Sequence, residues 1–249
     1  MKELRQLTPQ ECVLVYGLID IMPEGIFGNE AVDAGLVKAP DIRAFSIGLM
    51  HELLLDGLIV AGPMKSDASI EPWQIAPSAA IARITREWVE IWPEGSPVFG
   101  EIACFGNTPA GVTHAKEVEH LMYRPPKLDE DEAQKEKPAD KGHRYVMTRA
   151  RKHVIAFGDF EKAARLAGLK DPVDQRIYAR GLACEFLVMG ELELVERADG
   201  ELKPTGSVAE AIERLHEYLK ELPSPSPRGR LAARTSTLVF RLPPPKTSP

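Results

Sequence analysis

The sequence predicts a mainly α-helical protein with short β-hairpins, built from two winged-helix-like copies of a helix–helix–hairpin–helix unit. Three observations support this fold class: apolar residues recur at helical spacing, Gly and Pro punctuate the segments, and part of the sequence repeats. Residues 34–59 align without a gap on residues 167–192, at a constant offset of 133. Ten of the 26 aligned pairs are identical, whereas average residue frequencies would give only about one or two.

The first expected helix begins at Thr8. Thr8 and Glu11 have the spacing of a capping box, in which each side chain bonds the backbone N–H of the other residue. The residues that follow, 12–19, are apolar on every face, which indicates a buried helix. Pro23 is expected to end this segment, and residues 23–40 are expected to form a loop.

A second helix is expected over residues 41–55, where apolar residues repeat every three or four positions. Gly57 is well placed as its C-cap. Two short strands, 58–60 and 73–75, are then expected on either side of a loop rich in Gly, Pro, Lys, Ser and Asp. A third helix over residues 78–92 completes the first unit.

The second copy continues in the same order. Residues 191–195 are typical of a strand, Asp199 and Gly200 of a turn, and residues 201–203 of a returning strand. A helix is expected over residues 207–222, before the chain becomes rich in proline.

These elements divide the chain into four segments. Residues 1–95 form the first helix–hairpin unit, and residues 146–222 form the second. Between them, residues 96–145 hold an irregular segment and a charged linker. The last segment, 223–249, is rich in Pro and basic residues, so we expect most of it to be disordered, with room for one short strand at 237–240.

The composition argues against several classes of protein. A net charge of −6 and a pI of about 5.6 argue against a surface that binds nucleic acid or anionic membrane over its whole area. Three cysteines, far apart and without a CxxC pair, indicate neither a disulfide framework nor a cysteine zinc site. No apolar run approaches the length of about 18 residues that spans a bilayer. We therefore expect a cytoplasmic protein whose contact with a membrane is peripheral.

No catalytic signature occurs in the sequence, which lacks the patterns GxGxxG, GxxxxGK[ST], HExxH and GxSxG. Glu52 and Glu185 occupy equivalent positions among apolar neighbours, which favours a bond to a backbone amide or an arginine over a general-acid role. His114 and His120 lie six residues apart, which is not a metal-ligand spacing on a helix. We expect no enzyme activity, no metal and no cofactor.

Two arginines of the second unit are the best candidates for binding an anion. Arg176 and Arg180 are four residues apart, so both guanidinium groups can face one phosphate. Arg43 occupies the position in the first copy that Arg176 occupies in the second. The alternative is a solvated helix face on which these arginines form surface ion pairs.

A basic cluster precedes the second unit. Residues 141–153 contain basic side chains and no acid, and they include Arg149, Arg151 and Lys152. Such cations would add attraction to an anionic surface. The alternative is that the cluster offsets the charge of the acidic linker beside it.

Four stretches resemble the Golgi phosphoprotein 3 (GPP34) family, in the same order along the chain. Residues 7–20 (LTPQECVLVYGLID) are similar to the family's opening helix. Residues 48–59 (GLMHELLLDGLI) are similar to its Gly-φ-φ-φ-Glu-Leu-x-x-x-Gly-x-Ile segment, where φ is apolar. Residues 88–91 (WVEI) resemble its Trp-Ile-Glu-Leu helix, and residues 176–190 resemble its second arginine-containing helix.

This resemblance implies a mostly helical, cytosolic, peripheral membrane protein. Eukaryotic members of the family bind phosphatidylinositol 4-phosphate and the cytosolic tails of Golgi enzymes. One of the family's headgroup arginines falls on Arg176, and another lies one position from Arg180. Ser46 replaces the arginine of the first helix, with Arg43 one turn earlier on the same face. The implied partner is an anionic lipid headgroup, held by Arg176, Arg180 and Arg43.

A tandem winged-helix regulator that binds DNA or a partner protein is the alternative hypothesis, because a helix followed by a two-stranded hairpin is also the shape of a winged helix. The two hypotheses require different geometry. Headgroup binding requires arginines from both copies to converge on one pocket. DNA binding requires the helix over residues 41–55 and its counterpart in the second copy to lie exposed on a common face.

Overall fold

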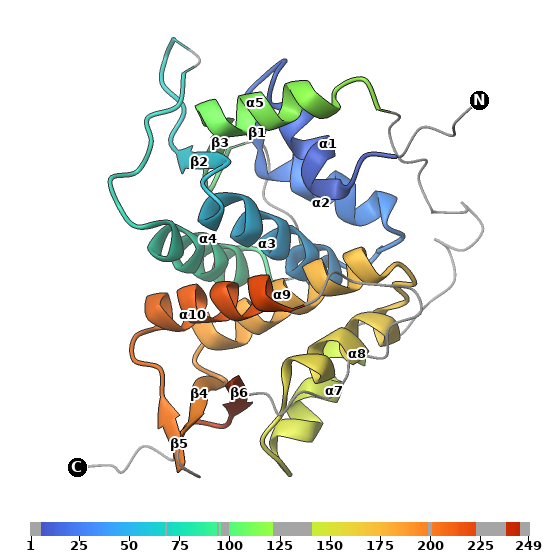
Figure 1. Cartoon of the computed structure of the whole chain (residues 1–249), viewed down its shortest axis with the longest axis vertical. Coiled ribbons are helices and arrows are strands. Elements are labelled where there is room, and N and C mark those ends of the chain that lie inside the picture. Colours follow the sequence, from blue (N-terminus) through green and yellow to red (C-terminus); the bar gives the residue numbers. More distant parts are fainter. Residues whose placement is uncertain are drawn as a thin grey trace.

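The computed structural model describes residues 6–67, 69–93, 95, 100–121, 141–198, 201–222 and 238–244. Over this part of the chain the fold is mainly α-helical with two small three-stranded antiparallel sheets, as the sequence predicts (Figure 1). The irregular segment predicted after residue 95 is wrong, because a strand (Cys104–Asn107) and a helix (Pro109–Val118) form there. The charged linker predicted to follow it, and most of the Pro-rich segment 223–249, lie outside the described residues.

Two long helices form the centre of the molecule: α3 (Ala39–Leu55) and α9 (Pro172–Val188). They pack directly against each other, and their bounds lie 133 residues apart, which is the offset of the sequence repeat. Both are mostly buried, and both have Pro within the first turn, where its missing N–H costs no helical hydrogen bond.

Equivalent glycines make this contact possible. A Cβ on Gly48 would lie 1.9 Å from the carbonyl oxygen of Ile177, and a Cβ on Gly181 would lie 1.6 Å from that of Ala44. Any side chain at either glycine would therefore push the two backbones apart, and the close approach of α3 and α9 requires glycine in both copies.

The elements of the first half surround α3. They are α1 (Pro9–Tyr16), β1 (Met22–Pro23), α2 (Glu24–Asp33), β2 (Ile59–Gly62), α4 (Pro77–Ile91), β3 (Cys104–Asn107) and α5 (Pro109–Val118). The capping box predicted for α1 is confirmed: the Thr8 backbone N–H donates to Glu11 Oε2 at 2.7 Å, and the Glu11 N–H donates to Thr8 Oγ1 at 3.3 Å.

The elements of the second half surround α9. They are α7 (Lys141–Ala150), α8 (Phe157–Ala167), β4 (Glu193–Ala198), β5 (Glu201–Pro204), α10 (Val208–Glu221) and β6 (Leu238–Arg241). The predicted hairpin is confirmed by the pairing of β4 with β5. Ser207 caps α10 with a capping box that Glu210 completes. Strand β6 lies within one residue of the short strand expected at 237–240, and it pairs with β4.

The loop predicted over residues 23–40 is wrong, because α2 occupies residues 24–33. Pro23 and the glycines of this stretch suggested a break. Pro23 instead stands at the N-cap, where a proline is compatible with a helix start. The buried side chains of Phe27 and Ala31 then attach the helix to the core.

The first hairpin also differs from the prediction. Strand β2 lies beside β3, in the order β1-β3-β2, and no strand forms at 73–75. The chain does return beside β2, since the Trp73 N–H donates to the carbonyl of Ala61 at 2.9 Å and Met64 bridges Ile70. The second sheet has the order β5-β4-β6.

One apolar core joins the two halves and includes side chains from α3 and α9 together with the inner faces of the surrounding helices. Its largest fully buried members come from both halves, among them Trp88 and Tyr178. Within the described residues, no helix has the length and apolar character needed to cross a membrane.

Candidate functional site

A cleft of about 250 Å³ lies where α1, α3, α9 and α10 meet, and it contains two of the three predicted arginines. Helix α9 contributes Arg176 and Arg180, one turn apart. Helix α3 contributes Glu52 and Asp56, and α10 contributes His216 and Lys220, while Gln10 of α1 completes the polar lining. Charges of both signs therefore face one small space.

The side chain of Arg180 lines this cleft, is buried and forms an ion pair with Glu52. Gln10 Nε2 donates a second hydrogen bond to Glu52, at 2.9 Å. Arg180 Nε is buried and has no hydrogen-bond partner in the described part of the chain. A buried donor without a partner carries a desolvation cost, and this N–H has almost no accessible surface, so it is not itself open to a ligand in the cleft.

Arg176 lies toward α8. Its Nε is 3.7 Å from Glu161 Oε1, and both side chains are largely buried. Burial lowers the pKa of Arg176, and the neighbouring charge of Arg180 lowers it further, while Glu161 opposes the shift. Burial likewise raises the pKa of Glu161, against the attraction of Arg176. The two arginines repel each other, so an added negative charge between them is favourable.

Asp56 lies on the opposite wall. Its Oδ1 is 3.2 Å from His216 Nε2 and 2.6 Å from Lys220 Nζ. Burial alone would raise the pKa of Asp56, but bonds to His216 and Lys220 bring it to about 2.

Behind His216, the ring of His51 lies 5.5 Å from the His216 ring, centre to centre. Burial, and then the charge of Arg180, hold the pKa of His51 well below 6.5, so His51 is neutral at pH 7.

Arg43 is not part of this cleft. Its Nη2 and Nε donate to Glu185 at 2.7 and 3.3 Å, and its Nη1 donates to the carbonyl of Pro93 at 2.8 Å. The structure thus brings Arg176 and Arg180 together and places Arg43 in a separate, buried ion pair. Glu52 and Glu185 each bond an arginine, in agreement with the expected structural role.

A second feature is the cationic surface of α7 and α8. Residues 141–170 contain only two acids, Asp159 and Glu161, and neither is exposed. Lys162 Nζ lies 5.0 Å over the ring of Tyr145, so the outer surfaces of the two helices are adjacent. We call the eight exposed cations of this stretch the α7–α8 cationic face: Lys141, Arg144, Arg149, Arg151, Lys152, Lys162, Arg165 and Lys170.

This face includes the predicted cluster of Arg149, Arg151 and Lys152. Some of its members have intramolecular partners: Arg149 Nε is 3.5 Å from Asp159, and Arg165 Nη1 donates to Gln175 at 3.3 Å. With eight cations and two acids, residues 141–170 carry a charge of +6 in a chain whose net charge is −6. Residues 141–170 are therefore strongly basic within an acidic chain, and the acidic stretch of residues 129–140 directly precedes them in the sequence.

Sequence reasoning missed the contribution of α10. His216 and Lys220 are four residues apart, which places both on one side of that helix. This spacing predicts that His216 and Lys220 share one side of α10, but it does not predict that this side faces Asp56. No group of His, Cys, Asp and Glu side chains suited to a metal ion occurs among the residues that the structure describes.

Comparison with known proteins finds no family model, no curated protein and no solved structure that matches this chain.

Proposed function

We propose that this chain is a non-catalytic peripheral protein that binds an anionic membrane surface through the α7–α8 cationic face. The observation that carries the proposal is the set of eight exposed cations within residues 141–170, on α7, on α8 and in the segments that follow each helix, beside only two acids, neither of them exposed. The cleft of Arg176 and Arg180 begins beside this helix pair, because Arg176 contacts Glu161 of α8. A lipid headgroup at the cleft is thus compatible with docking through the cationic face.

Binding to a membrane through several cations together is energetically more favourable than binding through a single cation. Each lysine or arginine near an anionic bilayer contributes about 1 kcal/mol, so one cation binds weakly and several act together. Exposed charges are screened over about 8 Å at physiological ionic strength. Binding through this face is therefore expected to weaken steeply as salt is added.

The cleft adds selectivity. Arg176 and Arg180 have acidic partners in Glu161 and Glu52, so the cleft carries little excess charge for attracting an anion from a distance. It offers instead two planar guanidinium groups, one turn apart on α9. A phosphate held there would accept from geometrically fixed donors. The arginines of the headgroup site would both come from the second half, because Arg43 is paired with Glu185.

The alternative of a duplicated winged-helix regulator requires exposed recognition helices. Helices α3 and α9 cover each other, and their cations Arg43 and Arg180 are buried in ion pairs. His51 is fully buried as well. The burial of these helices argues against sequence-specific DNA binding, so the membrane proposal is preferred.

Co-sedimentation with vesicles tests the proposal. The vesicles contain phosphatidylcholine alone, or with added phosphatidylserine, or with added phosphatidylinositol 4-phosphate. Wild-type protein is expected to pellet with both anionic vesicles and not with neutral ones. Arg149→Ala/Arg151→Ala/Lys152→Ala is expected to lose most of this binding, because three of eight face charges are gone.

The matched control removes three exposed cations elsewhere, in Lys65→Ala/Arg86→Ala/Lys116→Ala, and is expected to pellet like wild type. Equal loss in both triple variants, or no pelleting of wild type, would contradict the proposal. Arg176→Lys/Arg180→Lys keeps the charges but removes the planar forks. This variant is expected to keep binding to phosphatidylserine and to lose any preference for phosphatidylinositol 4-phosphate. Preferential binding to a fluorescent DNA duplex would instead support the regulator.

A further inference from the structure

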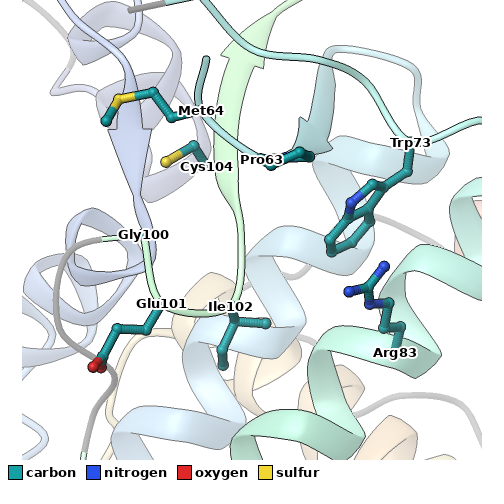
Figure 2. A pocket seen from close by; sticks show the side chains of 8 residues that line it. All are labelled: Pro63, Met64, Trp73, Arg83, Gly100, Glu101, Ile102 and Cys104. Atoms are coloured by element: carbon teal, nitrogen blue, oxygen red, sulfur yellow. The ribbon is translucent and has the colours of Figure 1, made fainter. Parts of the chain in front are cut away.

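A second hollow lies on the far side of the first half, away from the cationic face. It measures about 420 Å³ and is bounded by the segment that follows β2, by α4 and by residues 100–104 (Figure 2). Its size lies within the range of small-molecule sites, about 300–1,000 Å³. None of its lining residues belongs to the Arg176–Arg180 cleft or to the α7–α8 cationic face.

One end of the hollow is a stacked pair. Arg83 Cζ lies 4.2 Å from the centre of the Trp73 ring, which fixes the plane of the guanidinium group. Trp73 is held in turn by its backbone hydrogen bond to Ala61. Arg83 Nε donates to Glu87 Oε1 at 2.8 Å, and no described residue accepts from Nη1 or Nη2. The outer edge of the fork is therefore open to a ligand.

The remaining lining is mixed, because apolar side chains lie beside Glu101 and Gly100. The apolar members are Pro63, Met64 and Ile102, and Met64 is 48% exposed although it is a large apolar side chain. Cys104 adds its sulfur; burial, and then the charge of Glu24, raise the pKa of its thiol, so it is neutral at pH 7. The side chain of Glu101 points away from Trp73 and Arg83 (Figure 2). The hollow is thus amphipathic, with a cation at one end only.

We propose that this hollow binds a small carboxylate with an apolar body. The two carboxylate oxygens accept from Nη1 and Nη2 of Arg83, and the apolar body packs between the Trp73 ring and Met64. A planar fork matches a carboxylate in shape and hydrogen bonding. The apolar side chains of the lining disfavour a highly charged phosphate, which would lose its hydration there without gaining partners. The proposal is independent of membrane binding.

The test uses 4-phenylbutyrate and its neutral amide as probes of the full-length chain. Binding is followed by the nuclear magnetic resonance signals of the Trp73 indole N–H and the Met64 methyl group. We expect 4-phenylbutyrate to shift both signals and the amide to bind at least about tenfold more weakly, because a charge-assisted bidentate contact is lost.

Substitutions on α4 identify the charge responsible. Arg83→Gln is expected to weaken 4-phenylbutyrate binding about tenfold, and Arg83→Lys by less, since it keeps the charge and loses the fork. Arg86→Gln removes an exposed cation of the same helix that does not line the hollow, and it is expected to bind normally. Equal affinity for acid and amide, equal loss in the Arg86 variant, or unchanged Trp73 and Met64 signals would each overturn the proposal.

Discussion

The two ends of the α3–α9 crossing carry the same charged residues at equivalent positions of the repeat, but these residues form different contacts. Arg43 and Glu185 form a closed ion pair at one end, sealed by the carbonyl of Pro93. At the other end the repeat places Arg176 and Glu52 in the equivalent positions. There Arg176 turns toward Glu161, and Arg180, one turn later, bonds Glu52 in the wall of an open cleft.

A single residue accounts for much of this difference. The position equivalent to Arg180 in the first copy is Ile47, an apolar core residue. The second copy therefore has a second arginine on its central helix, and this arginine, Arg180, pairs with Glu52. One end therefore holds a closed ion pair, while the other places Arg176, Arg180, Glu52 and Asp56 around an open cleft.

The largest expected effect comes from the contact that both ends share. Gly181→Ala should lower the free energy of unfolding by about 3 kcal/mol or more, because its Cβ would overlap the backbone carbonyl of Ala44, which cannot move aside as a side chain can. Gly158→Ala on α8 is the control: no atom lies within 4 Å of that Cβ, so a gain of about 0.5–1 kcal/mol is expected. Urea denaturation measures both, and equal losses would show that the crossing is not tight.

The next largest effect separates the closed ion pair from the open one. Glu185→Gln should cost about 3 kcal/mol, because it leaves Arg43 charged in a buried site. Glu52→Gln should cost less, about 2 kcal/mol, because it also leaves a buried arginine charged, but Glu52 is one-quarter exposed and water can reach its position. The free energies of unfolding from urea titrations test the ranking. A larger loss in the Glu52 variant would reverse the interpretation of the two ends.

The smallest expected effect is a pH dependence of stability that arises only from residues at the cleft end of the crossing. His51 has a folded pKa well below its unfolded value of 6.5, so the unfolded chain binds more protons below pH 6.5. Its contribution to stability is therefore complete above pH 6.5 and declines as the pH falls, by about 1 kcal/mol between pH 7 and 5.5.

The contribution of Asp56 has a different pH range. Its folded pKa of about 2 lies below its ordinary 3.8, so its stabilisation persists down to about pH 4 and is lost only in stronger acid. His51→Gln should accordingly flatten the thermal stability profile between pH 7 and 5.5 and leave the loss below pH 4. If the thermal stability of His51→Gln falls between pH 7 and 5.5 as it does in wild type, another group is responsible for this pH dependence.

Local signals in the sequence predicted the elements whose ends are fixed by their own side chains. Thr8 and Glu11 start α1, and the helix predicted from Ser207 is α10. Pairings across long loops escaped prediction. The partner of β2 is β3, more than 40 residues later, and no period in the sequence identifies it.

The candidate site was predictable only in part for the same reason. Helical spacing placed Arg176 and Arg180 on one side of a helix. It could not show that Arg43 faces Glu185, 142 residues away, nor that α10 brings Lys220 to Asp56. Those facts depend on how the helices pack, which a pattern within one helix does not encode.

The crossing at Gly48 and Gly181 has a consequence for folding cooperativity. Each central helix covers the other, and the apolar core runs through both halves without a boundary. A fragment that contains only one half would expose the buried face of its central helix to water, at a cost of about 25 cal/mol for each Å² of apolar surface. The two copies in the sequence are therefore not two independently stable modules, and the described chain should unfold in a single transition.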